Sequence, residues 1–179
     1  MIPSLNLEST GYPLKPKINH SAFALIAIGH GDSRLYLLQW NTKWGVFNLI
    51  GGKVDNEKGD ENSFAQTMHR ELEEEMGLKY PEDFVVQREL KHIYLSQFSQ
   101  RQRAFKNYHF CVFDVDIFPN LPMDRARAHT YARWLSTGRQ NIFTSKEEIV
   151  QLRTYQNKPI SSTTKLILHE LGELSPYAC

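Results

Sequence analysis

The sequence is poor in cysteine, in net charge and in long apolar runs. Its two cysteines, Cys111 and Cys179, can form neither a disulfide framework nor a four-cysteine zinc site, and we expect a reducing, cytoplasmic location. The 21 Lys and Arg residues against 20 Asp and Glu leave a net charge of +1, which argues against a dedicated nucleic-acid or membrane-surface protein. The longest apolar run, residues 22–28, is far shorter than the about 20 residues of a membrane span.

The composition is that of one globular domain behind a short arm. With 41% apolar and 12% aromatic residues among 179, the chain can bury a core. Residues 1–18 contain Pro3, Pro13 and Pro16 and lack the apolar centre of a secretory signal, so they are expected to form an N-terminal arm. Residues 19–179 are expected to form a single domain.

Strands and helices alternate along this domain. Ser63 followed by Gln66 fits a capping pattern, and a four-residue apolar repeat then predicts a helix that ends at Gly77. Further helices are expected at about 145–152 and 161–172. Apolar runs and period-two alternation predict strands at 21–28 and 35–40, which would form a hairpin, and at 47–54, 84–98, 105–117 and 132–135. This alternation favours an α/β fold, a sandwich around a mixed β-sheet.

The predicted helix at 63–77 carries an acidic cluster. Glu71, Glu74 and Glu75 lie at i, i+3 and i+4, so their carboxylates share one helix face. Such a face can be an ordinary solvated surface, partly relieved by Arg70 one turn before Glu74. It can equally be a site for Mg²⁺, which prefers carboxylate oxygens and bridges to substrate phosphates. Charge alone leaves both interpretations open.

A motif around this cluster favours the second interpretation. Residues 70–78 read Arg-Glu-Leu-Glu-Glu-Glu-Met-Gly-Leu, and residues 51–54 read Gly-Gly-Lys-Val. Together they resemble the box of the Nudix hydrolases, which runs from a glycine through a glutamate to Arg-Glu-apolar-x-Glu-Glu-x-Gly-apolar. The resemblance implies a Nudix-type α/β/α sandwich. It also implies a metal-dependent pyrophosphohydrolase, in which water attacks a nucleoside diphosphate linked to another group: a nucleoside triphosphate, a nucleotide sugar or a dinucleotide.

The same resemblance assigns roles to individual residues. Glu71, Glu74 and Glu75, with the backbone of Gly52, would hold Mg²⁺, for which Mn²⁺ could substitute. Glu71 would be a further ligand or the base that activates water, and Arg70 would hold a box carboxylate in place. The implied catalytic residues are therefore Arg70, Glu71 and Glu74.

The first half of the motif departs from the family pattern. Asn62 stands where the pattern has glutamate, and the segment from Gly52 to Arg70 is four residues longer than expected. Glu61 or Glu57 could take the displaced role. The departure keeps a second function open, a catalytically weak Nudix module that binds a nucleotide as a sensor. A mere acidic interaction helix is disfavoured by the intact spacing of residues 70–78.

Substrate contacts are expected outside the acidic helix. Residues 47–53, Phe-Asn-Leu-Ile-Gly-Gly-Lys, resemble a run found in Nudix members that hydrolyse oxidised purine nucleoside triphosphates. Asn48 could therefore bond a base edge, or simply the backbone at a strand end. The candidate substrate-binding residues are Trp44, Phe47, Asn48, Gly51 and Lys53.

Other polar residues give weaker signals. A basic stretch could bind polyphosphate or be scattered surface charge. His20, His109 and His129 show no ligand spacing, and Cys111 is expected in the core. A homodimer is a further expectation. The basic stretch comprises Arg101, Arg103, Lys106, Arg125, Arg127, Arg133 and Arg139.

Overall fold

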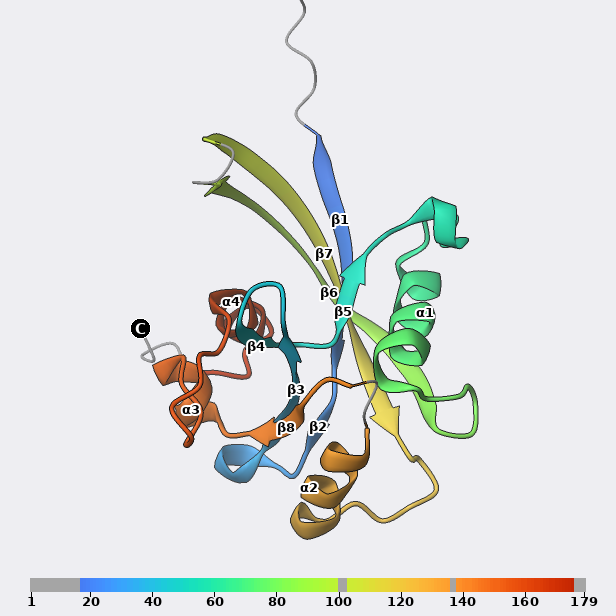
Figure 1. Ribbon diagram of the computed structural model, residues 1–179, viewed down its shortest axis with the longest axis vertical. Coiled ribbons are helices and arrows are strands. Elements are labelled where there is room, and N and C mark those ends of the chain that lie inside the picture. The colour runs from blue at the N-terminus through green and yellow to red at the C-terminus, as the bar shows by residue number, and fades with distance from the viewer. Residues whose placement is uncertain (1–16, 100–102, 136–137, 176–179) are drawn as a thin grey trace, which may run out of the picture.

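Two four-stranded β-sheets form the centre of the fold in the computed structural model, which describes residues 17–99, 103–135 and 138–175 (Figure 1). The first sheet contains β1 (Ile18–Leu25), β5 (Gly51–Lys53), β6 (Phe84–Ser99) and β7 (Ala104–Ile117). Its strand order is β5-β1-β7-β6. β1 runs parallel to β7, whereas the other two pairings are antiparallel, so the sheet is mixed as predicted.

The second sheet is built around one strand. Its members are β2 (Ala27–Ile28), β3 (Leu35–Asn41), β4 (Val46–Asn48) and β8 (Asn141–Thr144). β3 pairs antiparallel with each of the other three. The short links from β1 to β2 and from β4 to β5 join the two sheets, and the second link brings the glycines of β5 against β1.

The described residues form four α-helices around the two sheets. They are α1 (Phe64–Met76), α2 (Arg125–Trp134), α3 (Lys146–Gln151) and α4 (Ser162–Glu170), with short 3₁₀ turns η1 (Gly31–Ser33) and η2 (Asn56–Lys58). Along β1, Ala22 and Ala24 join the core cluster of Met68 from α1, whereas Phe23 joins that of Ile167 from α4. Figure 1 shows α1 and the α3–α4 pair on opposite sides of the strands. The predicted α/β/α sandwich is confirmed.

The sequence signals for α1 match its local structure. The side-chain oxygen of Ser63 accepts a hydrogen bond of 3.3 Å from the backbone N–H of Gln66. Gly77 ends the helix with φ 66°, a left-handed conformation that glycine adopts without strain. Met68 and Leu72 of the apolar stripe are fully buried, and each such side chain contributes about 1.5–3 kcal/mol to folding. Burial of this stripe fixes which face of α1 carries the glutamates.

The first predicted strand is divided between the two sheets. β1 ends at Leu25, and β2 alone pairs with β3, through Ala27 with Tyr36 and Ile28 with Leu35. The hairpin predicted from 21–28 and 35–40 is therefore only two residue pairs long. The reason is that the edges of β1 are taken by β5 and β7.

The strand predicted at 132–135 is wrong, because these residues belong to the end of α2 and its cap. Asp124 begins α2 by accepting a hydrogen bond of 2.8 Å from the backbone N–H of Arg127. Ala128 and Ala132 turn toward the core. A four-residue segment such as 132–135 fits a helix end as well as a strand, and the cap formed by Asp124 is the sequence signal that distinguishes the two.

The C-terminal elements follow the prediction. α3 begins with a reciprocal capping box between Ser145 and Glu148, and α4 begins after Ser161. Most of the predicted N-terminal arm, residues 1–16, and Cys179 lie outside the described residues. Within the described ranges, no helix combines the length and apolar character that a membrane span requires.

Candidate active site

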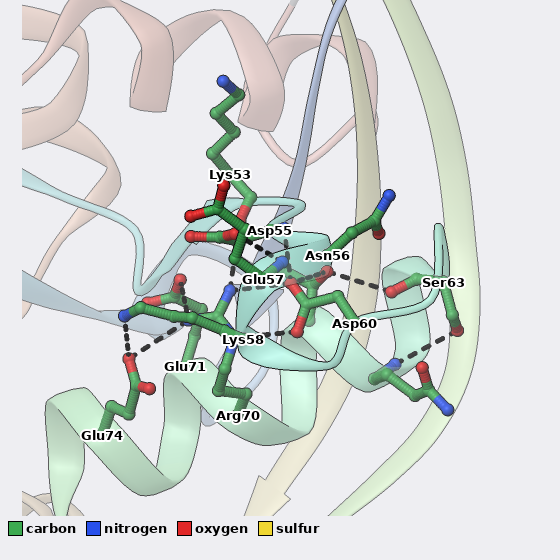
Figure 2. Close-up of polar contacts among 12 residues, drawn as sticks. Lys53, Asp55, Asn56, Glu57, Lys58, Asp60, Ser63, Arg70, Glu71 and Glu74 are labelled. Atoms are coloured by element: carbon green, nitrogen blue, oxygen red, sulfur yellow. Dashed lines mark hydrogen bonds and ion pairs between the residues drawn. The ribbon is translucent and has the colours of Figure 1, made fainter.

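The lengthened loop before α1 is held by one buried carboxylate, that of Asp60, which is 1% exposed. Its Oδ1 accepts a hydrogen bond from Nε of Arg70 and its Oδ2 accepts one from Nη2, each 2.8 Å long. Oδ2 also accepts a hydrogen bond from the Thr67 hydroxyl. It accepts another from the backbone N–H of Asp55, and Figure 2 shows Asp55, Asp60 and Arg70 in this group. These contacts, Arg70 first, hold the pKa of Asp60 well below its usual range. Asp60 therefore fastens the loop to α1.

Asp60, and neither Glu61 nor Glu57, is the loop carboxylate that binds Arg70. Both glutamates are exposed. Asn62, at the position of the family glutamate, instead exchanges two hydrogen bonds of 2.7 Å with Asn56 inside the loop. Counting along a lengthened loop did not single out Asp60. The available signal was an aspartate three residues before the helix cap.

Glu71 lies between Arg70 and the glycine strand. It is 8% exposed, and its Oε1 accepts a hydrogen bond of 2.8 Å from Nη1 of Arg70. A Cβ atom on Gly52 would overlap the Glu71 carboxylate, so a larger residue there would displace that carboxylate from its present position. Burial, and then the neighbouring charge of Glu75, raise the pKa of Glu71. A cation at this point would relieve both effects.

The other two glutamates also have basic partners. Glu74 accepts hydrogen bonds of 2.9 Å from Lys58 and 3.1 Å from Arg70, and the Lys58 contact is the main reason that its pKa is lowered. Glu75 forms an ion pair with Arg139. Each of the three carboxylates on this helix face is thus balanced by a cation of the chain itself.

This donor set fits a hard divalent cation. Glu71, Glu74 and Glu75 come from adjacent turns of one helix, and Glu71 lies against the side-chain-free backbone of Gly52. Carboxylate oxygens without nitrogen or sulfur donors are the ligands that Mg²⁺ and Mn²⁺ prefer. The structure therefore places Glu71, Glu74 and Glu75 on one helix face, with Glu71 against Gly52, but their carboxylate oxygens do not all lie within 4.8 Å of one another.

A cavity of about 440 Å³ opens beside the glycines and is within the size range of small-molecule sites. Its walls combine aromatic rings, among them Trp40, Trp44 and Tyr108, with lysines and Arg139. Glu75 also lines it, which joins the cavity to the acidic face of α1. The lysines on its walls are Lys43, Lys53 and Lys106.

Four of the five predicted substrate-binding residues line this cavity, namely Trp44, Asn48, Gly51 and Lys53. Asn48 also contacts α4. Its Oδ1 accepts a hydrogen bond of 2.7 Å from the Thr164 hydroxyl of α4. Phe47 instead is 1% exposed and packs edge-on against Trp40 at 5.1 Å between ring centroids. It is a core residue because adjacent residues of β4 point to opposite sides of the strand.

A larger cavity of about 890 Å³ lies between α2, β8 and the segment around Tyr155. It includes Arg125, Arg133 and Arg139, so Arg139 lines both cavities. The basic stretch is thereby divided, with Lys106 beside the glycines, Arg125 and Arg133 at the larger cavity, and Arg139 at both. Arg101 lies outside the described residues. The chemistry assigned to the box belongs with the smaller cavity, which contains Gly52 and Glu75.

Comparisons with known proteins agree with this geometry. The profile of the NUDIX domain family matches residues 18–151. Among solved structures, NrtR of Shewanella oneidensis with a 27mer DNA is 17% identical with a TM-score of 0.53, covering 86% of this chain and 60% of NrtR. The NUDIX domain of that NrtR with ADP ribose is 16% identical with a TM-score of 0.50, covering 94% and 92%. The Ap4A hydrolase of C. elegans is 13% identical with a TM-score of 0.51, covering 88% and 98%.

The TM-scores at these low identities show a shared fold. The chain covers 60% of the DNA-bound NrtR. No curated protein sequence matches the chain as a relative. The profile match carries the family assignment, since residues 18–151 make up most of the sequence and contain the whole box. The chain therefore belongs to the Nudix hydrolase family.

Proposed function

We propose that the chain is a divalent-metal-dependent pyrophosphohydrolase. Its substrate would be a nucleoside diphosphate linked to another group, and the attacking group would be water. One observation carries the proposal: the glutamate face of α1 borders a cavity whose walls hold both aromatic and basic side chains. Glu75 and Gly52 belong to that cavity, so the acidic face and the substrate space are continuous.

Glu71, Glu74 and Glu75 would hold the metal ion, Mg²⁺ or in its place Mn²⁺. When bound, such an ion neutralises developing charge on phosphorus oxygens and lowers the pKa of an attacking water. Lys58 and Arg139 form ion pairs with Glu74 and Glu75, so these cations would compete with a metal ion for the two carboxylates.

Side chains of the protein would supply the base and hold it in position. Glu71 is buried and its pKa is raised, which suits a carboxylate that accepts a proton from water. Arg70 keeps that carboxylate oriented through the Nη1 contact while Asp60 holds the guanidinium from the other side. Arg70 is accordingly a positioning residue in this proposal.

The cavity walls support a nucleotide as the substrate. Trp44 offers an exposed ring for stacking on a base, and Lys53 and Lys106 offer charge for phosphates. Structural neighbours named for Ap4A hydrolysis and for an ADP ribose complex support the same class. Nucleoside triphosphates, nucleotide sugars and dinucleotides all share the diphosphate that this arrangement would cleave.

The test is a panel of these three nucleotide types with Mg²⁺ or Mn²⁺, run on the wild type, Glu74→Gln and Glu73→Gln. We expect cleavage of at least one nucleotide and a loss of about 10²-fold or more in Glu74→Gln, the size seen when a charge-stabilising group is removed. Glu73 is an exposed neighbour outside the predicted ligand set, so Glu73→Gln should retain activity. Equal losses in both variants would contradict the assigned roles.

A sensor that binds a nucleotide without cleaving it is the second candidate. It is favoured by the basic partners of Glu71, Glu74 and Glu75, and by the resemblance to NrtR, a protein solved with DNA and with ADP ribose. Calorimetry with the same panel would separate the two candidates, because a sensor binds a nucleotide tightly with no turnover. A homodimer and a cytoplasmic location stay predictions from the sequence.

A further inference from the structure

Five side chains of residue types that can bind metal ions gather on the face of the first sheet that α1 covers. They are His20 of β1, Glu89 and His92 of β6, and His109 and Cys111 of β7. The strand register creates the group, since His109 pairs opposite His20 and Cys111 pairs opposite His92. Phe64, the first residue of α1, contacts all three imidazole rings at centroid distances of 4.8 to 5.9 Å.

A β-bulge brings Glu89 to this face. In a regular strand, residues three apart point to opposite faces, so Glu89 and His92 would not meet. The register of β6 against β7 shifts between Glu89 and Lys91, which leaves Leu90 as an extra residue. The shift restores the phase, and Nε2 of His92 lies 2.6 Å from Oε1 of Glu89. Bulges of this kind often re-aim a side chain next to a functional site.

We propose that Glu89, His92 and Cys111 bind a Zn²⁺ ion. Their three candidate ligand atoms all lie within 4.8 Å of one another, with Sγ of Cys111 4.0 Å from Nε2 of His92. Ligands of a tetrahedral zinc ion lie about 3.5 Å apart, so a small side-chain adjustment would seat the ion. The ion would replace the proton of the Cys111 thiol and the one shared by Glu89 and His92.

The two remaining histidines continue from His92 in a chain of ring contacts. Nδ1 of His92 lies 2.7 Å from Nε2 of His109, and Nδ1 of His109 lies 3.1 Å from Nδ1 of His20. With its Nε2 on the metal, His92 would donate its other ring proton to His109, and His109 would donate to His20. Zinc-bound histidines commonly have such a second hydrogen bond, which fixes their tautomer and orientation.

The donor chemistry distinguishes this group from the glutamate face of α1. A mixed set of sulfur, imidazole and carboxylate suits zinc, whereas Mg²⁺ prefers oxygen donors alone. Cys111 is fully buried, but the side chains of Glu89 and His92 are 50% and 38% exposed. These exposed ligands give the ion a path from solvent, and three protein ligands leave a fourth position for water.

Cobalt titration tests the proposal without using enzyme activity. Co²⁺ is added to the full-length protein in excess Mg²⁺, with Cys179→Ser in every sample so that Cys111 is the remaining cysteine. We expect a thiolate-to-cobalt charge-transfer band that saturates at one equivalent and that Zn²⁺ removes. The samples are the Cys179→Ser parent and this parent carrying Cys111→Ser, His92→Gln, Glu89→Gln, His109→Gln or the matched control His30→Gln, a change of an exposed histidine elsewhere.

The band should disappear in Cys111→Ser, and the affinity should fall by about tenfold or more in His92→Gln and Glu89→Gln. His109→Gln should keep the band with an affinity lower by about 10- to 100-fold, the usual cost of a lost outer hydrogen bond. His30→Gln should match the parent. Absence of a thiolate band in the parent, or parent affinity in both exposed variants, would overturn the proposal. Neither result depends on whether the chain cleaves a nucleotide.

Discussion

The carboxylate of Asp60 and the guanidinium of Arg70 form a bidentate ion pair, with both hydrogen bonds 2.8 Å long. Asp60 is nearly inaccessible to solvent, so this pair is a buried one. Nη1 of Arg70 is left to hold Glu71 and Glu74. The position of the box carboxylates therefore depends on Asp60. This residue lies two places before Asn62, the position at which the family pattern has its glutamate.

Replacing Asp60 by Asn should destabilise the protein by about 3 kcal/mol, because it leaves the Arg70 charge buried with a weaker partner. Urea denaturation would measure this loss. Glu61→Gln is the matched control, since Glu61 is an exposed acidic neighbour in the same loop. A free energy of unfolding equal to the wild type in Asp60→Asn, or an equal loss in Glu61→Gln, would show that the ion pair does not hold the loop.

The same pair predicts a pH dependence of stability. The pKa of Asp60 is lowered in the folded chain, so its contribution is complete above the unfolded value of about 3.9 and disappears as the pH falls toward the folded value. The difference in unfolding free energy between wild type and Asp60→Asn should be constant from about pH 5 to 8 and shrink below about pH 4. Denaturation curves at several pH values would check this, and a difference that shrinks at neutral pH would contradict the assignment to Asp60.

Glu71→Gln should separate stability from activity. The raised pKa of Glu71 means that its charge is unfavourable in the folded, metal-free chain above the unfolded value of about 4.3. At pH 7 without metal, Glu71→Gln should therefore melt at the same temperature as the wild type or higher. Glutamine can still accept the hydrogen bond from Arg70.

Catalysis should nevertheless fall by about 10²-fold or more in Glu71→Gln, since a metal ligand or base is lost. Addition of Mg²⁺ should raise the melting temperature of the wild type more than that of the variant. Thermal melts with and without Mg²⁺, beside the activity assay, give both quantities. A variant that melts much lower than the wild type without metal would mean that Glu71 serves folding instead.

The local features of the site were predictable from sequence because short-range rules govern them. The glutamates of α1 share a face through helix periodicity alone, and Gly77 ends the helix at the predicted residue. The partner of Arg70 was not predictable by counting. The loop is lengthened by four residues, and only its folded path shows that Asp60 turns inward while Glu61 and Asn62 adopt positive φ angles, 49° and 60°.

The other predictions were limited because the sequence does not show which face of a strand each side chain occupies. The run at 47–53 made both Phe47 and Asn48 candidate substrate residues, yet the pleat buries Phe47 against Trp40 and leaves Asn48 on the cavity wall. The group of Glu89, His92 and Cys111 has no regular ligand spacing in sequence. It requires a bulge in β6 and the pairing of two strands, neither of which a period-two pattern reveals.

Trp44 offers the sharpest test of where the substrate binds. Its side chain lines the smaller cavity and is 62% exposed, so Trp44→Ala should leave stability unchanged within about 0.5 kcal/mol. Loss of a stacking surface costs about 1–3 kcal/mol per base, which corresponds to a KM at least about fivefold higher. The chemical step relies on α1, so kcat should change little.

Trp134→Ala is the matched control for this measurement. Trp134 is a tryptophan of similar exposure, 72%, at the end of α2 and away from the smaller cavity. Steady-state kinetics on the preferred nucleotide should therefore give a raised KM in Trp44→Ala and a wild-type KM in Trp134→Ala. Unchanged KM in both variants would place the base elsewhere, and the larger cavity with Arg125 and Arg133 would then be the next surface to mutate.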